Sequence, residues 1–192
     1  MKENNWFDPF YIQSHLNEEE SNIQKNVRDF CNNELKPTVV ERNRKNEFDK
    51  ELYPKFGSLG VLGQTVKTHG GSGTSNLAYG LVAYEFEKID SSYRSSISVQ
   101  SSLVIHPINE FGSQEQKDKY LPPLIKGEKI GCFGLTESEA GSDPASMKTS
   151  FKKTKDGYIL NGSKNWITNA PIADIFIIWA IEENKDHKSI KG

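Results

Sequence analysis

The sequence is poor in cysteine, and this argues against disulfide frameworks, metal sites and thiol catalysis. Its 192 residues include only two cysteines, Cys31 and Cys132, which lie far apart within apolar patterns. Neither has a histidine partner or forms a CxxC pair, so no metal-ligating group is expected. We interpret both as buried free thiols of a reducing compartment.

The sequence also has no basic excess and no long apolar run. It carries 24 basic and 26 acidic side chains, a balance that does not favour binding to a phosphate backbone. The longest apolar run, "IFIIWAI", is far shorter than the roughly 20 residues of a membrane-spanning helix. The first residues, "MKENNWFDPF", lack the features of a secretory or organelle signal. We expect neither a nucleic-acid nor a membrane partner, and a bacterial-type cytoplasmic protein (mitochondrial matrix in a eukaryote).

The first two thirds of the sequence have the periodicity of helices. Asn17 precedes three glutamates and is a candidate N-cap, and Ser113 with Gln116 has the pattern of a capping box. A proline pair, Pro122 and Pro123, is expected to end the last helix. We interpret His106 as a packed core residue. Apolar spacing predicts helices over residues 17–35, 49–59, 75–89, 93–111 and 113–121.

The period then changes to that of strands. Residues 129–137 and the run "ADIFIIWAIEE" read as single strands, and residues 146–169 alternate around a hairpin turn at Lys155–Gly157. Helices followed by strands predict an α+β fold in two domains, 1–128 and 129–192. The strand part is small and has open edges, so we expect it to lack sheet partners.

Two polar segments in the strand part suggest a ligand site. Backbone N–H groups at the strand end in "GCFGLTESEAGSDPASM", with the hydroxyls of Thr136 and Ser142, can bind a heterocycle edge or a pyrophosphate. The alternative is a plain turn. In "NGSKNWITNAP", the indole of Trp166 can pack on a flat cofactor ring and Thr168 can hydrogen-bond to it, whereas a tryptophan in a strand is commonly a core residue. Together the segments favour a cofactor.

These segments carry a family resemblance. "CFGLTE…GSDP" followed by "LNGSKNWITNA" resembles the signature of acyl-CoA dehydrogenases, flavoenzymes that desaturate acyl-CoA thioesters. "LGVLG" and "GSQEQKDKYLPPLIKGEKIGCFGLTE" extend the similarity over most of the chain, and "SSYRSSISVQSSLV" is most similar to the glutaryl-CoA dehydrogenase branch. The resemblance implies an all-α N-terminal domain followed by the first part of a β-barrel-like domain, without the family's C-terminal helical bundle.

The resemblance also implies functional residues. FAD and an acyl-CoA would bind here, and electrons would leave through an electron-transfer flavoprotein. Ser142 would lie near both FAD and the phosphopantetheine arm of the substrate. The FAD residues would be Phe133, Gly134, Leu135, Thr136, Gly141, Ser142, Trp166, Ile167 and Thr168. The substrate residues would be Glu87, Arg94, Ser95, Ser98 and Ser142.

Arg94 is expected to select the substrate. Straight-chain acyl groups offer a guanidinium nothing to pair with, whereas glutaryl-CoA ends in a carboxylate that it can bind through charge-assisted hydrogen bonds. Ser91, Arg94 and Ser98 can share one helical face, although residues 90–92 interrupt the pattern between Glu87 and Arg94. The alternative role for Arg94 is an ordinary salt bridge.

The family's catalytic glutamate lies in a C-terminal domain, so the resemblance implies no base within residues 1–192; Glu137 and Glu139 are not expected to replace it. The chain is expected to be part of a homotetrameric enzyme that oxidises and decarboxylates glutaryl-CoA to crotonyl-CoA, in lysine and tryptophan degradation. Alone it is expected to be inactive, because a positioned base supplies about a hundredfold or more. The alternatives are another short-chain or branched acyl-CoA, and a non-catalytic truncated product.

Overall fold

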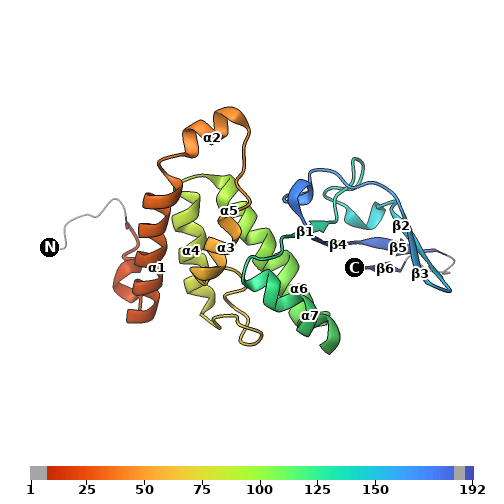
Figure 1. Cartoon of the computed structure of the whole chain (residues 1–192), viewed down its shortest axis with the longest axis horizontal. Coiled ribbons are helices and arrows are strands. Elements are labelled where there is room, and N and C mark those ends of the chain that lie inside the picture. Colours follow the sequence, from red (N-terminus) through yellow and green to blue (C-terminus); the bar gives the residue numbers. More distant parts are fainter. Residues whose placement is uncertain (1–7, 184–188) are drawn as a thin grey trace.

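The structure is a computed structural model that describes residues 8–183 and 189–192. Helices form one end of an elongated molecule and strands form the other (Figure 1). This order confirms the α+β fold expected from the sequence, and no helical domain follows the strands within the described residues. Part of the N-terminal stretch considered as a targeting signal, residues 1–7, lies outside the described residues.

The first long helix begins where the sequence predicts. α1 (Glu18–Phe30) starts with a reciprocal capping box, in which Glu20 N donates to Asn17 Oδ1 at 2.8 Å and Asn17 N donates to Glu20 Oε2 at 3.2 Å. It continues into a π-helical turn, η2 (Cys31–Leu35). The predicted helix over residues 17–35 is therefore confirmed.

The second predicted helix begins later than expected. α3 (Leu52–Ser58) follows a short helix, α2 (Val39–Lys45), and the carboxylate of Asp49 accepts a hydrogen bond from Glu51 N before α3 starts. Pro54 therefore lies in the first turn of α3, where a backbone N–H has no intrahelical acceptor to lose. This placement explains why the helix tolerates the proline.

Two helices meet at a sharp break. α4 (Asn76–Glu87) is capped by Ser75, whose Oγ accepts from Ala78 N. α5 (Ser91–Ser98) is capped by Asp90 and therefore begins at Ser91 rather than at the predicted Tyr93.

A continuous helical path follows α5. It runs through the π-helical segment η3 (Val99–Ile105) into α6 (His106–Phe111). His106 is exposed, so its interpretation as a packed core residue is wrong. The i→i+5 bonds of η3 change the helical phase, and a 3.6-residue period does not carry through to His106.

The prediction that Pro122 and Pro123 end the last helix is wrong. α7 (Gln114–Ile125) begins with the expected capping box of Ser113 and Gln116 and passes through both prolines. Leu121, Leu124 and Ile125 are buried in the shared core of the helices. Burial of each of these side chains contributes about 1.5–3 kcal/mol of stabilisation. This contribution offsets the backbone hydrogen bonds that the two prolines cannot donate.

The helical core is rich in aromatic side chains. Tyr53, Phe56 and Phe86 are fully buried, and the rings of Phe56 and Phe86 pack edge to face with centroids 5.3 Å apart. Cys31 lies in the same core, and burial raises the pKa of its thiol to about 12. Cys31 and Cys132 are free and buried, as the sequence predicts.

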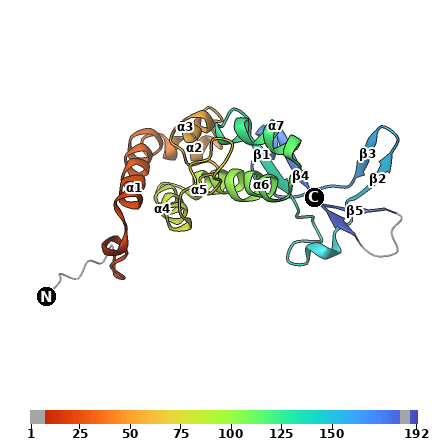
Figure 2. The ribbon, with the colours of Figure 1, turned by 90° about the horizontal axis from the view of Figure 1, so that it is seen from below.

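The strands form two small sheets. β1 (Gly131–Gly134) pairs in parallel with β4 (Ile175–Ile178). The second sheet has the order β3-β2-β5-β6 and is built on the predicted hairpin of β2 (Ser150–Thr154) and β3 (Gly157–Asn161). The hairpin projects at the end of the molecule opposite α1 (Figure 2).

The run expected to be one strand is two. Trp179 separates β4 from β5 (Ala180–Glu182), which joins the second sheet and pairs with β6 (Ile190–Lys191). β1 is likewise shorter than the predicted strand over 129–137. Short 3-10 turns lie at Ile12–His15, Pro144–Ser146 and Ala170–Ile172. Within the described ranges, no helix is long and apolar enough to cross a membrane.

One buried side chain joins the helices to the strands. Gln100 Nε2 donates to Leu124 O and Lys129 O, both at 2.9 Å, and its Oε1 accepts from Gly131 N at 2.8 Å. Asp174 adds contacts to Lys129 Nζ and Ile130 N. The predicted boundary between domains 1–128 and 129–192 falls in this segment between α7 and β1.

Candidate functional site

The two segments expected to share a cofactor lie side by side. Asn165 N donates to Thr136 O at 2.9 Å, and Lys164 Nζ donates to Leu135 O at 2.9 Å. The end of β1 is thus bound to the segment that leads into Trp166, although the two are about thirty residues apart. Among the described residues, no acceptor contacts the backbone N–H of Leu135 or Thr136.

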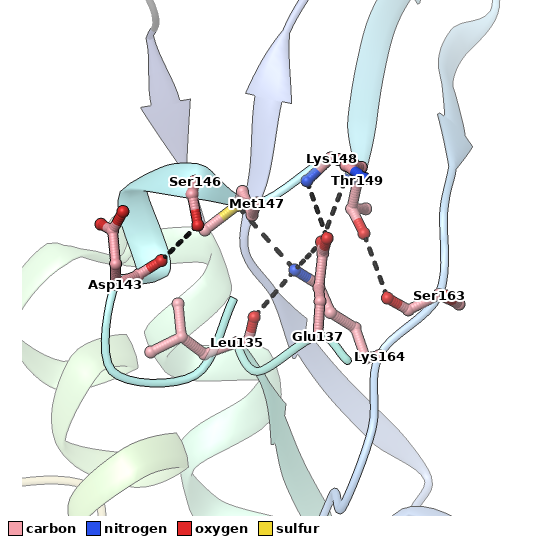
Figure 3. A network of polar contacts seen from close by, with 9 residues as sticks. All are labelled: Leu135, Glu137, Asp143, Ser146, Met147, Lys148, Thr149, Ser163 and Lys164. Atoms are coloured by element: carbon pink, nitrogen blue, oxygen red, sulfur yellow. Dashed lines mark hydrogen bonds and ion pairs between the residues drawn. The ribbon is translucent and has the colours of Figure 1, made fainter. Parts of the chain in front are cut away.

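A buried ion pair holds these segments together, as Figure 3 shows. Lys164 Nζ lies 2.8 Å from Glu137 Oε1, and the other Glu137 oxygen accepts from Lys148 N at 2.7 Å. Thr149 N also donates to Glu137, at 2.9 Å. Burial disfavours the Glu137 charge, but these hydrogen bonds outweigh it and lower the pKa of Glu137 to about 2. Glu137 therefore stays ionised and binds Lys164 to the backbone of residues 148–149.

Sequence reasoning missed Lys164. It lies in a polar loop after β3, where a lysine is ordinarily solvated, and only the folded structure places its side chain beside Glu137. The neighbouring pair of Lys148 and Glu139 is exposed instead. The two glutamates that attracted attention in the sequence thus have different surroundings.

Trp166 does not lie in a strand. β3 ends at Asn161, and Trp166 follows in a bend with a left-handed φ of 58° and a side chain 92% exposed. The expectation of a strand through this residue is wrong, because the backbone turns away to form the contacts of Lys164 and Asn165. Ile167 is half-buried and Thr168 is exposed. The flat indole is therefore available to a planar ligand.

Two of the predicted cofactor residues, Phe133 and Gly134, lie in β1 and pack against neighbouring side chains. The half-buried Phe133 ring packs edge-on against Trp179, with centroids 5.9 Å apart. Gly134 is buried, and a Cβ there would approach Ile178 Cδ1 to 2.6 Å, so a larger residue would require the end of the Ile178 side chain to shift. The family resemblance assigns both residues to the cofactor site. In the structure, Phe133 packs against Trp179 and Gly134 lies close to Ile178.

Gly141 and Ser142 lie in an exposed loop after β1. The loop folds back through a bridge between Glu137 and Ala140, and Ser146 Oγ donates to Asp143 O at 2.8 Å (Figure 3). In the described part of the chain, no hydrogen bond links Ser142 to Trp166 or to the end of β1. The structure thus joins the end of β1 directly to the segment of Trp166, but not Gly141 and Ser142.

A second cluster forms at the break between α4 and α5. Arg94 Nε donates to Glu87 Oε2 at 2.7 Å, and Ser91 Oγ donates to Glu87 Oε1 at 2.5 Å. The hydrogen bond from Ser91, followed by that from Arg94, lowers the pKa of Glu87 below its ordinary value. The break that made the shared face uncertain in the sequence instead brings Glu87 and Arg94 into contact, with both side chains partly exposed.

The serines of α5 continue this face. Ser98 Oγ lies 3.1 Å from the hydroxyl of Tyr79 on α4, and the same hydroxyl lies 2.5 Å from Ser102 Oγ. Ser95 is half-buried beside Arg94 and makes no side-chain hydrogen bond within the described residues. Tyr79 was not among the expected site residues, because the apolar spacing that predicts the helix over residues 75–89 does not indicate contacts with Ser98 and Ser102.

The fold and these segments define a helical domain that leads into a strand domain, with one polar cluster in the strand domain and a second at the break between α4 and α5. Residues 17–128 match the acyl-CoA dehydrogenase N-terminal domain, and residues 132–192 match the acyl-CoA dehydrogenase middle domain. The chain belongs to the acyl-CoA dehydrogenase family.

Individual relatives differ in the substrate that their names give. The chain is 39% identical to a short-chain specific acyl-CoA dehydrogenase of Clostridium acetobutylicum, over 92% of this chain and 46% of the relative. It is 41% identical to the mitochondrial isovaleryl-CoA dehydrogenase of Bos taurus, over 86% and 39%. The chain thus spans less than half the length of these curated relatives.

A solved structure is similar over nearly the whole chain. It is a glutaryl-CoA dehydrogenase from Mycobacterium smegmatis in complex with FADH2, with 41% identity and a TM-score of 0.89. The similarity covers 95% of this chain and 47% of that one.

Proposed function

We propose that the complete protein is an FAD-dependent acyl-CoA dehydrogenase that acts on glutaryl-CoA. The observation that carries this proposal is the contact between Glu87 and Arg94 at the break between α4 and α5. It presents a guanidinium on a partly exposed helical face, where a substrate carboxylate needs a cation. The similarity to a glutaryl-CoA dehydrogenase structure supports the same substrate.

The guanidinium of Arg94 keeps donors for such a ligand. Arg94 contacts Glu87 through Nε, and within the described residues no acceptor contacts either Nη group. An arginine carries five N–H donors in a planar fork, so the two Nη groups can bind a carboxylate at two points. The contact with Glu87 holds the guanidinium plane while the fork binds the substrate.

The residues around Trp166 fit a flavin. The open indole suits a planar ring, and the unpaired backbone N–H groups of Leu135 and Thr136 suit the polar edge of that ring. Thr168 adds an exposed hydroxyl on the same segment. The chemistry that FAD supplies when bound is acceptance of a hydride from the acyl chain.

The part of this chain in the reaction is binding and orientation. Lys164 and Glu137 hold the end of β1 against the segment of Trp166, so the donors and the indole keep a fixed spacing. We propose decarboxylation to crotonyl-CoA, electron transfer to an electron-transfer flavoprotein and a homotetrameric assembly on the family resemblance. The base that removes the α-proton is then supplied from outside these residues.

A neutral short-chain or branched acyl-CoA is the second candidate substrate. Relatives named for short-chain acyl-CoA and isovaleryl-CoA are 39% and 41% identical to the chain. Glu87 also neutralises part of the Arg94 charge, which lowers the attraction for a second carboxylate.

The substitution Arg94→Gln separates the two substrates. In the FAD-loaded complete gene product, we expect the dissociation constant of glutaryl-CoA to rise about ten- to a hundredfold, as expected for losing a hydrogen bond to a charged group. That of valeryl-CoA should stay within about twofold, because it has no carboxylate. Ser92→Ala, an exposed change on the same helix, serves as the matched control. Equal losses for both ligands would favour the neutral substrate.

A further inference from the structure

Tyr79 places its hydroxyl between two serine hydroxyls. The Tyr79 oxygen lies 3.1 Å from Ser98 Oγ, at the end of α5, and 2.5 Å from Ser102 Oγ, within η3. All three residues are half-buried at the contact between α4 and the helical path that follows it. Ser98 lies one helical turn after Arg94 and on the same face.

The three hydroxyls form a chain with a direction. Each carries one proton and accepts through its lone pairs, so the phenol of Tyr79 can donate to only one of the two serines. When Ser102 donates to Tyr79 and Tyr79 donates to Ser98, the proton of Ser98 is left to point outward. Hydrogen bonds in such a row polarise and strengthen one another. In the opposite direction, the proton of Ser98 is used internally.

A bound anion selects the first direction. A carboxylate is an acceptor only, so beside Arg94 it stabilises the arrangement in which Ser98 donates to it. Ser98 cannot serve this role equally well alone, because its hydroxyl rotates freely once the bond to Tyr79 is lost. The phenol therefore determines how often the Ser98 proton points toward the ligand.

We propose that Tyr79 is a positioning residue for substrate specificity. Its hydroxyl fixes the rotamer and proton of Ser98, so that Ser98 and Arg94 together bind the distal carboxylate of a dicarboxylic acyl-CoA. This inference rests on the proposed function and extends it to a residue that does not itself touch the substrate. Ser102 completes the chain as the donor to Tyr79.

The test compares two ligands in the FAD-loaded complete gene product. Tyr79→Phe keeps the ring and removes the hydroxyl. We expect the dissociation constant of glutaryl-CoA to rise about three- to tenfold, the effect of one neutral hydrogen bond, and that of valeryl-CoA to stay within about twofold. Ser92→Ala, an exposed change on the same helix and outside the hydroxyl chain, should leave the ratio of the two constants unchanged.

A double-mutant cycle separates positioning from general packing. In a Ser98→Ala background, Tyr79→Phe should have no further effect on glutaryl-CoA, because it acts through Ser98. An equal effect in both backgrounds, or equal losses for both ligands, would overturn the proposal. If Tyr79→Phe does not fold, Ser102→Ala is measured instead. We then expect a smaller loss of affinity that is confined to glutaryl-CoA. An unchanged ratio of the two dissociation constants would overturn the proposal.

The parallel Arg94→Gln measurement distinguishes the two levels of inference. A selective loss with Arg94→Gln and none with Tyr79→Phe rejects the role of Tyr79 and leaves the proposed function standing. No selective loss with either variant rejects the glutaryl-CoA function, and the role of Tyr79 with it.

Discussion

Lys164 Nζ lies 2.8 Å from Glu137 Oε1, and the two side chains are only 8% and 9% exposed. The pair of Lys148 and Glu139 has a similar distance, 2.7 Å, but its side chains are 79% and 76% exposed. Solvent screens the second pair and not the first. The two pairs share one loop region, so they offer a matched comparison of a buried and an exposed ion pair.

Lys164→Met should strongly destabilise the fold. Methionine keeps the length of the side chain but leaves the buried Glu137 carboxylate without its cation, and breaking a buried pair costs about 3–5 kcal/mol. The measurement is the free energy of unfolding in urea. Lys148→Met is the control, with a change below about 1 kcal/mol because its pair is exposed. Similar losses in both variants would contradict this view of Glu137.

Stability should fall in acid because of Glu137. The pKa of its carboxyl is lowered from 4.5 to about 2 in the folded chain. The unfolded chain therefore binds this proton more readily, so the stabilisation is complete above the unfolded pKa and is lost as the pH falls from 4.5 toward 2. The measurement is the thermal unfolding midpoint between pH 7 and pH 2, compared between the unsubstituted protein and Glu137→Gln. A slope that is unchanged by Glu137→Gln would assign the acid sensitivity to other carboxyls.

Gln100→Ala should loosen the joint between helices and strands. The substitution leaves Leu124 O, Lys129 O and Gly131 N without the Gln100 side chain, and unsatisfied buried groups cost about 1–3 kcal/mol each. We expect lower thermal stability and faster proteolysis near Lys129. Gln114→Ala is the control, because its hydrogen bond to Asp118 is exposed. Proteolysis at the wild-type rate would show that the joint does not depend on Gln100.

Trp166→Ala should separate binding from stability. The side chain is 92% exposed, so its removal should change the free energy of unfolding by less than about 0.5 kcal/mol. If the proposed flavin site is correct, FAD affinity falls, as a fluorescence titration would show. Trp179→Ala is the contrast, because Trp179 packs against Phe133 and its loss should destabilise the strands. Unchanged FAD affinity in Trp166→Ala would exclude the indole from the site.

Local sequence signals predicted the starts of several helices well. Asn17 with Glu20, and Ser113 with Gln116, form reciprocal side-chain and backbone contacts within one turn. Such contacts depend on neighbours in the sequence and hardly on the rest of the fold. The hairpin of β2 and β3 is predictable for the same reason, because a short turn joins two alternating segments.

The errors lie where burial overrules a local preference. Pro122 and Pro123 disfavour helix, yet α7 continues because its last turn contributes Leu124 and Ile125 to the core. The apolar run around Trp179 has the period of one strand, but its two halves pair with different partners. A periodicity within one segment holds no information about the strand that will lie beside it.

The sequence by itself determined the order of helices before strands, the capped helix starts, the hairpin and the segments that resemble an acyl-CoA dehydrogenase. The tertiary structure alone decided that Lys164 neutralises Glu137, that Glu87 meets Arg94 across a helix break, and that Tyr79 lies between Ser98 and Ser102. Caps and turns depend on bonds between near neighbours, whereas these contacts arise only when burial of the apolar core brings distant segments together.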